Sequence, residues 1–244
     1  MSMPKLSKRI SAWFTNRGKG VGFHMMLSTI AKNFINLIYP LHCALCRRRL
    51  GPEDASGVCD QCIADIKRIP KPYHKPCGRA PAYSARLYEG KLKELIHLFK
   101  YKRQPRLGNI LSEIMIDFLK ENPDIPDGIN IITYVPLHTG RLRRRDYNQS
   151  MILSRNISKE LKIPLSDILA KVKATRPQNE LSRNERLTNL KGAFKIRGGF
   201  KAKGLKFLLI DDVMTTGATL NECVKVLLVA GANEVRCFTL SRGT

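Results

Sequence analysis

Two adjacent carboxylates, followed by a loop of small residues, form the strongest chemical pattern in the sequence. The apolar run 207–210 has the composition of a buried strand, and Asp211 and Asp212 follow it directly. A helix is expected over 220–229, so its unpaired N–H groups and the positive end of its dipole face the loop. Such a turn favours phosphate binding. The residues predicted to hold the phosphate are Met214, Thr215, Thr216, Gly217, Ala218 and Thr219.

The two carboxylates need a partner other than the phosphate, because like charges repel each other. The vicinal hydroxyls of a ribose suit Asp211 and Asp212, since each hydroxyl can donate to an ionised carboxylate. No lysine follows Gly217, so the loop is not a nucleoside-triphosphate P-loop. The simpler alternative is a strand-to-helix turn in which the acids only cap the helix. The pattern favours a pocket for a ribose 5-phosphate group.

Four of the seven cysteines form two C-x-x-C pairs separated by twelve residues. Each pair places two thiolates on one tight turn, and two such turns supply the tetrahedral sulfur set that zinc prefers. The predicted ligands are Cys43, Cys46, Cys59 and Cys62. Disulfides or free thiols are the alternative, but no export signal places the chain in an oxidising compartment. We predict a structural zinc ion, because this short module buries little apolar surface alone.

The remaining cysteines have weaker patterns. His74 and Cys77 repeat the ligand spacing once, and they either replace one turn of the metal site, extend that site or have no ligand role. Cys223 and Cys237 lie in apolar surroundings, and we interpret them as buried small hydrophobes.

The chain is strongly basic, since 43 Lys and Arg against 20 Asp and Glu give a net charge of +23. This field attracts anionic ligands, and nucleic acid is the favoured polymer; a solubilising surface is the alternative. The basic stretch 171–206 is typical of a mobile loop that closes over a ligand. Tyr101, Tyr147 and Phe194 are candidate stacking partners for bases, with burial in the core as the competing interpretation.

Alternating strand and helix patterns indicate the elements that must position these groups. Strands are expected over 85–88, 129–135, 207–210 and 234–240. Helices are expected over 91–100, 109–120, 148–161 and 220–229. This order predicts an α/β fold with a mostly parallel sheet flanked by helices. Ligands in such sheets bind at the carboxyl ends of the strands, where the acid pair lies.

Composition divides the chain into three parts. Residues 1–40 form a basic extension with a helix at about 23–38, residues 41–82 hold the zinc module and a proline-rich linker, and residues 83–244 form the larger domain. No apolar run reaches the roughly 20 residues of a membrane span, and no secretory signal is clear. We expect a cytoplasmic protein, with weak attachment to an anionic membrane surface as the alternative.

The stretch 207–221 resembles the phosphoribosyl-pyrophosphate signature of type I phosphoribosyltransferases. In that family the two acids bind the ribose 2- and 3-hydroxyls, and the loop wraps the 5-phosphate. The pattern over 37–241 resembles the ComF family of competence proteins, also called ComFC or amidophosphoribosyltransferase-like, which joins a cysteine zinc module to a phosphoribosyltransferase domain. The resemblance implies that pyrophosphate or nucleic-acid phosphate is held by Val135, Pro136, Leu137, Lys100, Arg141, Arg144 and Arg145.

The arginine-rich element 141–145 also predicts an anion clamp by itself, because guanidinium groups bind pyrophosphate or nucleic-acid phosphate in a fork geometry. A solvated basic face is the alternative. Asp146 stands where the ComF family usually has glycine. We interpret it as an Arg-paired N-cap for the helix at Asn148 or as an acid that weakens anion binding. The stretch 178–194 resembles the flexible-loop region of the family.

The resemblance implies a protein that binds phosphoribosyl pyrophosphate with Mg²⁺ and handles single-stranded DNA during DNA uptake and natural transformation. Its expected partners include a DNA-uptake helicase or other competence proteins. The alternative is an active phosphoribosyltransferase of nucleotide or nucleoside metabolism with no DNA role. No residue stands out as a general base. A glutamine amidotransferase is set aside, because no cysteine precedes Cys43 to serve as an N-terminal nucleophile.

Overall fold

The structure is a computed structural model that describes residues 41–51, 56–66, 68–175 and 190–243. It divides into two compact units, Met1–Ile66 and Lys67–Thr244. The helix expected at 23–38 lies outside the described residues. Within the described part of the chain, no helix is long and apolar enough to cross a membrane.

Residues 41–51 and 56–66, the described part of the first unit, form two short turns and one helix. A backbone bridge joins His42 to Arg49, and helix α3 (Asp60–Ala64) begins just after Cys59. The N–H of Ala44 donates to the carbonyl of Gly57 at 2.9 Å, which ties the two cysteine-bearing turns together. The described core of this unit is small, as expected for a module of this length.

The second unit contains a five-stranded sheet with the strand order β1-β2-β7-β6-β3. Its strands are β1 (Arg68–Cys77), β2 (Ala80–Leu87), β3 (Ile131–Tyr134), β6 (Lys206–Met214) and β7 (Glu234–Arg242). Only the pairing of β1 with β2 is antiparallel, while β2, β7, β6 and β3 run parallel. The predicted α/β fold with a mostly parallel sheet is confirmed.

The predicted linker is wrong, because most of it belongs to this sheet. Residues 68–77 form β1 and residues 80–87 form β2, so the larger unit begins at Lys67 and not near residue 83. The prolines that suggested a linker lie mainly on β1, which is an edge strand. An edge strand tolerates proline because one side of its backbone has no neighbouring strand to accept its N–H groups.

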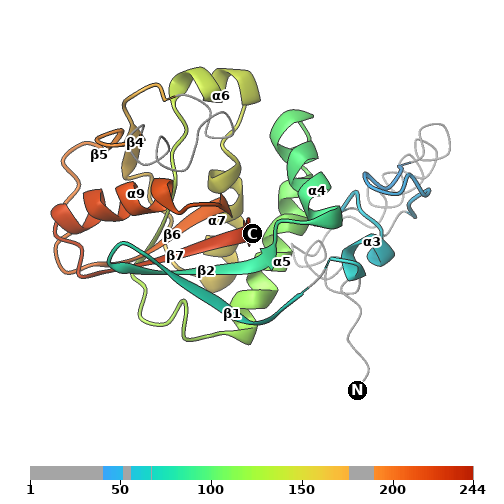
Figure 1. Cartoon of the computed structure of the whole chain (residues 1–244), viewed down its shortest axis with the longest axis horizontal. Helices are drawn as coiled ribbons and strands as arrows, with labels where there is room; N and C mark the ends of the chain where they lie inside the picture. The colour runs from blue at the N-terminus through green and yellow to red at the C-terminus, as the bar shows by residue number, and fades with distance from the viewer. Residues whose placement is uncertain (1–40, 52–55, 67, 176–189, 244) are drawn as a thin grey trace, which may run out of the picture. The chain divides into compact units, whose positions relative to one another are not determined.

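Helices cover both faces of the sheet (Figure 1). The described helices of this unit are α4 (Gly90–Tyr101), α5 (Leu107–Glu121), α6 (Thr139–Arg145), α7 (Gln149–Leu161) and α9 (Ala218–Val229). Helices α5 and α7 pack together and contact the sheet from one side, and α9 packs against the other side together with the small sheet of β4 (Leu169–Lys171) and β5 (Phe194–Ile196). The four helices predicted between residues 91 and 229 are confirmed, while α6 was not predicted.

Core side chains of β6 alternate between the two faces of the sheet, as the two-residue period of a strand requires. Phe207 and Leu209 pack in the cluster beneath α9, which also contains Cys223 and Cys237, and both of these cysteines are fully buried as predicted. Strand β6 is longer than expected. It continues through the acid pair to Met214, because β7 offers backbone partners that far along.

Candidate phosphoribosyl site and metal centre

The acid pair lies at the carboxyl end of β6, and its two side chains have different partners. The Nζ atom of Lys100, on α4, lies 2.8 Å from a carboxylate oxygen of Asp212. The hydroxyl of Ser150, in the first turn of α7, donates to Asp211 at 2.7 Å. The backbone N–H of Asp212 also donates to Asp211 at 2.9 Å. Three elements therefore hold the two carboxylates in place.

Asp211 is the more perturbed of the two acids. Burial raises the pKa of its carboxyl to about 7, and the neighbouring charge of Asp212 acts in the same direction. The hydrogen bond from Ser150 and the charge of Lys100 oppose this increase in the pKa. Asp211 consequently changes protonation near neutral pH, and a bound hydroxyl donor would favour its ionised form.

The loop after β6 leads directly into the N-terminus of α9. Gly217 is the N-cap of α9 and has a φ of 77°, which a residue with a side chain adopts only with strain. A Cβ atom at this position would lie 2.8 Å from the sulfur of Cys77. Thr215 is exposed at the tip of the loop, whereas Met214 and Ala218 are buried beneath it. Only the backbone of these buried residues could face a phosphate.

The segment after β3 reaches the same end of the sheet. Val135 donates its N–H to the carbonyl of Ile210 at 3.0 Å, and its own carbonyl accepts from the side chain of Asn148 at 3.0 Å. Val135 and Pro136 are buried, and Leu137 is partly buried. Val135, at the start of the predicted pyrophosphate loop, is thus fixed beside the acid pair.

Cationic groups come from two directions. Arg141, Arg144 and Arg145 lie on α6, where Arg144 is exposed and the other two are partly buried. Lys171, at the end of β4, was not singled out from the sequence, although it begins the basic stretch that was noted. Burial and the neighbouring charge of Arg141 lower the pKa of Lys171 to about 8, and the charge of Asp211 opposes this change. Lys171 therefore belongs to the electrostatic environment of the acid pair.

Asp146 is not an N-cap. It is the C-cap of α6 with a φ of 66°, and Asn148 caps α7 by accepting from the N–H of Ser150. A positive φ explains why glycine suits this position, and aspartate is among the few other residues that tolerate it. The predicted arginine pairing is present, but the partner is Arg103, whose Nε lies 2.9 Å from a carboxylate oxygen of Asp146.

The three candidate aromatic residues differ in exposure. Phe194 is 5% exposed and packs in the core, and the hydroxyl of Tyr147 donates to the carbonyl of Phe99. Tyr101 is 57% exposed. Among these three side chains, Phe194 is buried, Tyr147 is partly buried and only Tyr101 is exposed.

The four predicted zinc ligands meet in the first unit. The sulfur atoms of Cys43, Cys46, Cys59 and Cys62 all lie within 4.8 Å of one another. Two of them, from Cys46 and Cys59, are 3.6 Å apart. A tetrahedral zinc site with Zn–S bonds of about 2.3 Å requires sulfur separations of about 3.8 Å, so the cluster fits this ion.

Local hydrogen bonds prepare one thiolate for metal binding. Burial tends to raise the pKa of Cys43, but backbone N–H groups, first that of Cys59, lower it to about 6. The pKa of Cys59 is raised by burial, and the neighbouring cysteines Cys46 and Cys43 add to this. Crowded sulfur atoms of this kind favour a cation that neutralises them.

Cys77 belongs to the second unit. It is 4% exposed, and its sulfur lies 3.7 Å from that of Met214, beneath the loop that begins α9. The side chain of His74 lies outside the described residues, so its ligation stays a prediction. Gln178, Leu181, Arg186 and Asn189, from the flexible-loop resemblance, also lie outside them.

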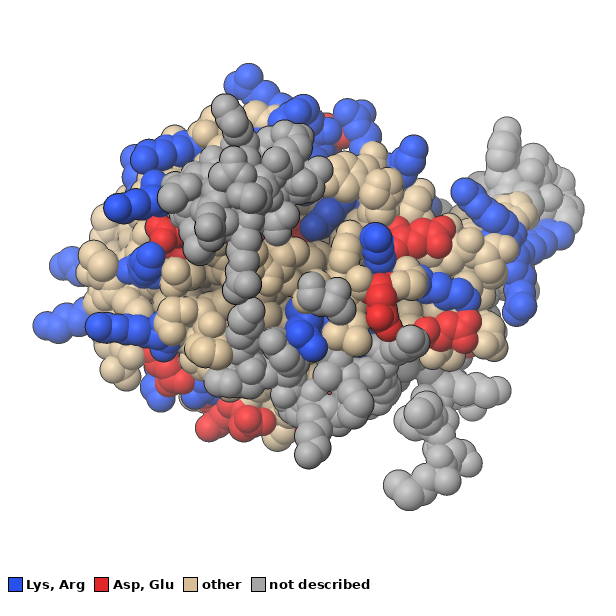
Figure 2. All heavy atoms as spheres, in the orientation of Figure 1, with Lys and Arg blue, Asp and Glu red and all other residues tan. Residues whose placement is uncertain are grey.

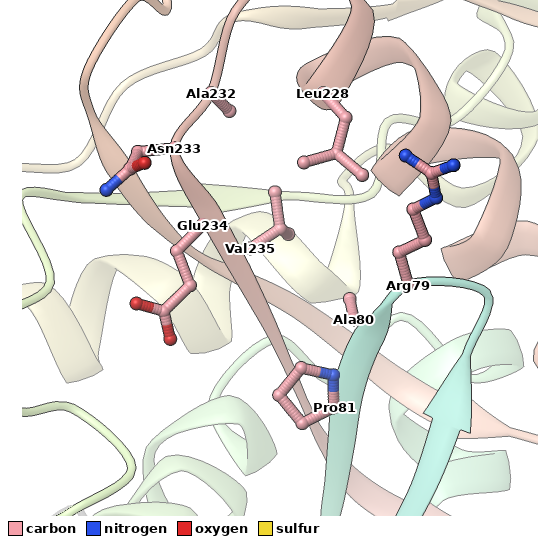
Figure 3. A pocket seen from close by; sticks show the side chains of 8 residues that line it. All are labelled: Arg79, Ala80, Pro81, Leu228, Ala232, Asn233, Glu234 and Val235. Carbon is pink, nitrogen blue, oxygen red and sulfur yellow. The ribbon is translucent and has the colours of Figure 1, made fainter.

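A pocket of about 430 Å³ lies between the start of β7 and the turn from β1 to β2. Leu228, Val235 and Ala80 point toward one another there, and Arg79 and Glu234 stand at its rim (Figure 3). None of the predicted site residues lines this pocket.

Comparison with known proteins agrees with this architecture. Residues 148–243 match the phosphoribosyl transferase domain, and residues 34–92 match the double zinc ribbon domain. The fold and the cysteine cluster therefore define a phosphoribosyltransferase-domain protein with an N-terminal zinc ribbon.

Full-length relatives make the assignment more specific. The chain is 31% identical over 236 residues to Competence protein F of Haemophilus influenzae, covering 86% of this chain and 99% of that protein. It is 32% identical over 214 residues to the DNA utilization protein YhgH of Escherichia coli K12, covering 82% of this chain and 89% of that protein. The chain belongs to the ComF family of competence proteins.

Among solved structures, the allosteric regulatory enzyme of purine biosynthesis is similar, with a TM-score of 0.40 and 18% identity over 59% of this chain and 29% of that chain.

Proposed function

We propose that the protein binds phosphoribosyl pyrophosphate together with Mg²⁺ at the end of β6. The observation that carries this proposal is the acid pair held by Lys100 and Ser150 beside the loop that begins α9. Asp211 and Asp212 would accept hydrogen bonds from the ribose hydroxyls, and the loop 214–219 would surround the 5-phosphate. Mg²⁺ would neutralise the pyrophosphate group.

The binding test is calorimetric titration of the protein with phosphoribosyl pyrophosphate in the presence of Mg²⁺. The double variant Asp211→Asn with Asp212→Asn keeps the shape of both side chains but removes their charge, so binding should be lost while the fold survives. Normal binding by this variant would show that the ligand, if bound at all, lies elsewhere.

We further propose that the protein acts in DNA uptake and natural transformation by handling single-stranded DNA in the cytoplasm. Two relatives named for competence and DNA utilization support this role, as does the net charge of +23. A DNA-uptake helicase or another competence protein is the expected partner. Affinity for a single-stranded oligonucleotide should fall steeply as salt increases, since phosphate contacts release counterions. Tight binding that ignores salt would contradict this role.

An active phosphoribosyltransferase of nucleotide metabolism is the second candidate. It is favoured by the charges of Lys171 and Arg141 near Asp211, which could stabilise departing pyrophosphate. The discriminating assay mixes the protein with Mg²⁺, phosphoribosyl pyrophosphate and candidate acceptors, including DNA, and measures pyrophosphate release. Release that requires an acceptor would establish an enzyme, whereas binding without turnover would favour the DNA-handling role.

A further inference from the structure

The most exposed aromatic side chain among the described residues belongs to a basic surface between α4 and α6. We define the Tyr101 surface as segments 101–106 and 143–146 together with His97; all of these residues are exposed except Arg145, which is partly buried. Two contacts join the segments: the guanidinium of Arg145 lies 4.9 Å from the centre of the Tyr101 ring, and Arg103 pairs with Asp146 at 2.9 Å.

This surface is charged to attract a polyanion. Its two segments contain six Lys or Arg and a single acid. That acid, Asp146, is already paired with Arg103, so it offers little repulsion. Lys and Arg side chains gather over α6 at the top of Figure 2. The remaining basic groups are Lys102, Arg106, Arg143, Arg144 and Arg145.

The ring of Tyr101 is held in place although it is exposed. Arg145 donates to its hydroxyl at 3.2 Å and to the side chain of Gln149 at 3.3 Å, and Gln149 is 1% exposed. The ring of His97 lies 4.9 Å away, one helical turn earlier. An aromatic ring that is fixed before binding loses less conformational entropy when a flat ligand stacks on it.

A fixed aromatic ring within a cationic surface suits unpaired bases. Single-strand binding proteins combine cations that follow the backbone with rings on which bases stack. We propose that the Tyr101 surface is the platform for single-stranded nucleic acid, with one base stacked at Tyr101 and the phosphates on the flanking Lys and Arg. This inference rests on the proposed DNA-handling role and gives it a location.

The platform adjoins the phosphoribosyl site through consecutive residues. In the last turn of α4, Lys100 faces Asp212 while Tyr101 faces solvent, since successive residues of a helix point about 100° apart. In α6 and α7, Arg145 lies on the platform while Ser150 contacts Asp211. A strand bound at Tyr101 would therefore pass beside the phosphoribosyl site.

The experiment measures binding of a fluorescent oligothymidylate by anisotropy at several salt concentrations. Tyr101→Ala should weaken binding roughly 5- to 150-fold, the range expected for the loss of one base stacked on an aromatic ring. Tyr101→Phe keeps the ring and should stay within a few-fold of the unmodified protein. Lys159→Ala removes an exposed charge at the C-terminal end of α7, and its affinity for the oligothymidylate should also stay within a few-fold of that of the unmodified protein.

Further measurements separate failure of the Tyr101 platform from failure of the DNA-binding role. Phosphoribosyl pyrophosphate binding by Tyr101→Ala reports that the fold is intact. Photocrosslinking to an oligonucleotide containing 5-iododeoxyuridine should label the peptide that contains Tyr101. If the unmodified protein binds the oligonucleotide but Tyr101→Ala binds equally well, or if the label maps elsewhere, the platform is refuted and the DNA role stands. If the unmodified protein does not bind at low salt, the DNA role itself fails.

Discussion

The ammonium of Lys100 lies 2.8 Å from a carboxylate oxygen of Asp212, across 112 positions of sequence. The side chains are 17% and 11% exposed, so this ion pair is largely shielded from water. Lys100 was predicted to bind pyrophosphate or nucleic-acid phosphate, and in the structure it pairs with one of the two acids that would bind the ribose. A lysine in this position can neutralise the acid pair before a ligand arrives.

Lys100→Met should weaken phosphoribosyl pyrophosphate binding at least 10-fold, because it leaves Asp212 without its cation next to Asp211. The free energy of unfolding should fall by about 3–5 kcal/mol, the typical effect of removing one partner of a buried ion pair. Calorimetry and urea denaturation measure the two effects. Lys102→Met is the matched control, since Lys102 is exposed, and it should leave binding unchanged. Equal behaviour of the two variants would mean that the Lys100 contact has no role.

The affinity for phosphoribosyl pyrophosphate should increase as pH rises through about 7. The pKa of Asp211 is raised from 3.8 to about 7, so the ionised carboxylate that accepts ribose hydroxyls forms only above that pH. The same shift predicts that the unliganded protein loses stability as the pH rises from about 4 to about 7. The folded state binds this proton more tightly than the unfolded chain does, so removing the proton disfavours the folded state.

Asp211→Asn is the reference for this titration. The phosphates of the ligand also titrate in this range, but they do so equally with both proteins. The difference between the unmodified protein and Asp211→Asn should therefore shrink as pH falls. A difference in affinity that stays constant from pH 5 to pH 8 would argue against titration of Asp211.

Gly217→Ala should destabilise the protein by about 2–4 kcal/mol and abolish phosphoribosyl pyrophosphate binding. The positive φ costs about 1 kcal/mol for a residue with a side chain, and the close approach to the Cys77 sulfur adds an overpacking cost of about 1–3 kcal/mol. Adding Cys77→Ala to Gly217→Ala should restore only the stability lost to overpacking, because the cost of the positive φ remains. Thermal unfolding measures this recovery. Gly140→Ala is the control, because a Cβ atom at this position would meet no atom closer than 3.6 Å. This variant should change the stability only slightly.

Removal of zinc should unfold the first unit. Cys46→Ala should lose the metal, because three sulfurs cannot complete the tetrahedral set. Cys77→Ala should keep one zinc ion per chain, since the four clustered sulfurs are sufficient without it. Metal analysis of the purified variants, with Co²⁺ substitution to report thiolate ligation, makes the comparison. Loss of zinc from Cys77→Ala would place this residue in the metal site after all.

The acid pair, the two C-x-x-C pairs and the alternation of strands and helices are local patterns, and the sequence by itself determined them. Spacing along a strand or a turn sets which groups lie together over a few residues. The parallel sheet, the four clustered cysteines and the loop after β6 could therefore be predicted before the structure was known.

Tertiary structure alone decided which distant groups meet. Lys100 and Ser150 reach the acids because α4 and α7 pack against the end of β6, and no periodicity contains that information. Strand pairing also decided that the proline-rich segment 68–77 forms a strand. Its place at the edge of the sheet allows prolines within it. Burial then separated three similar aromatic residues: packing encloses Phe194, while Tyr101 stays open on a basic surface. Long-range packing sets these outcomes, because exposure and partners depend on elements that are far away in the chain.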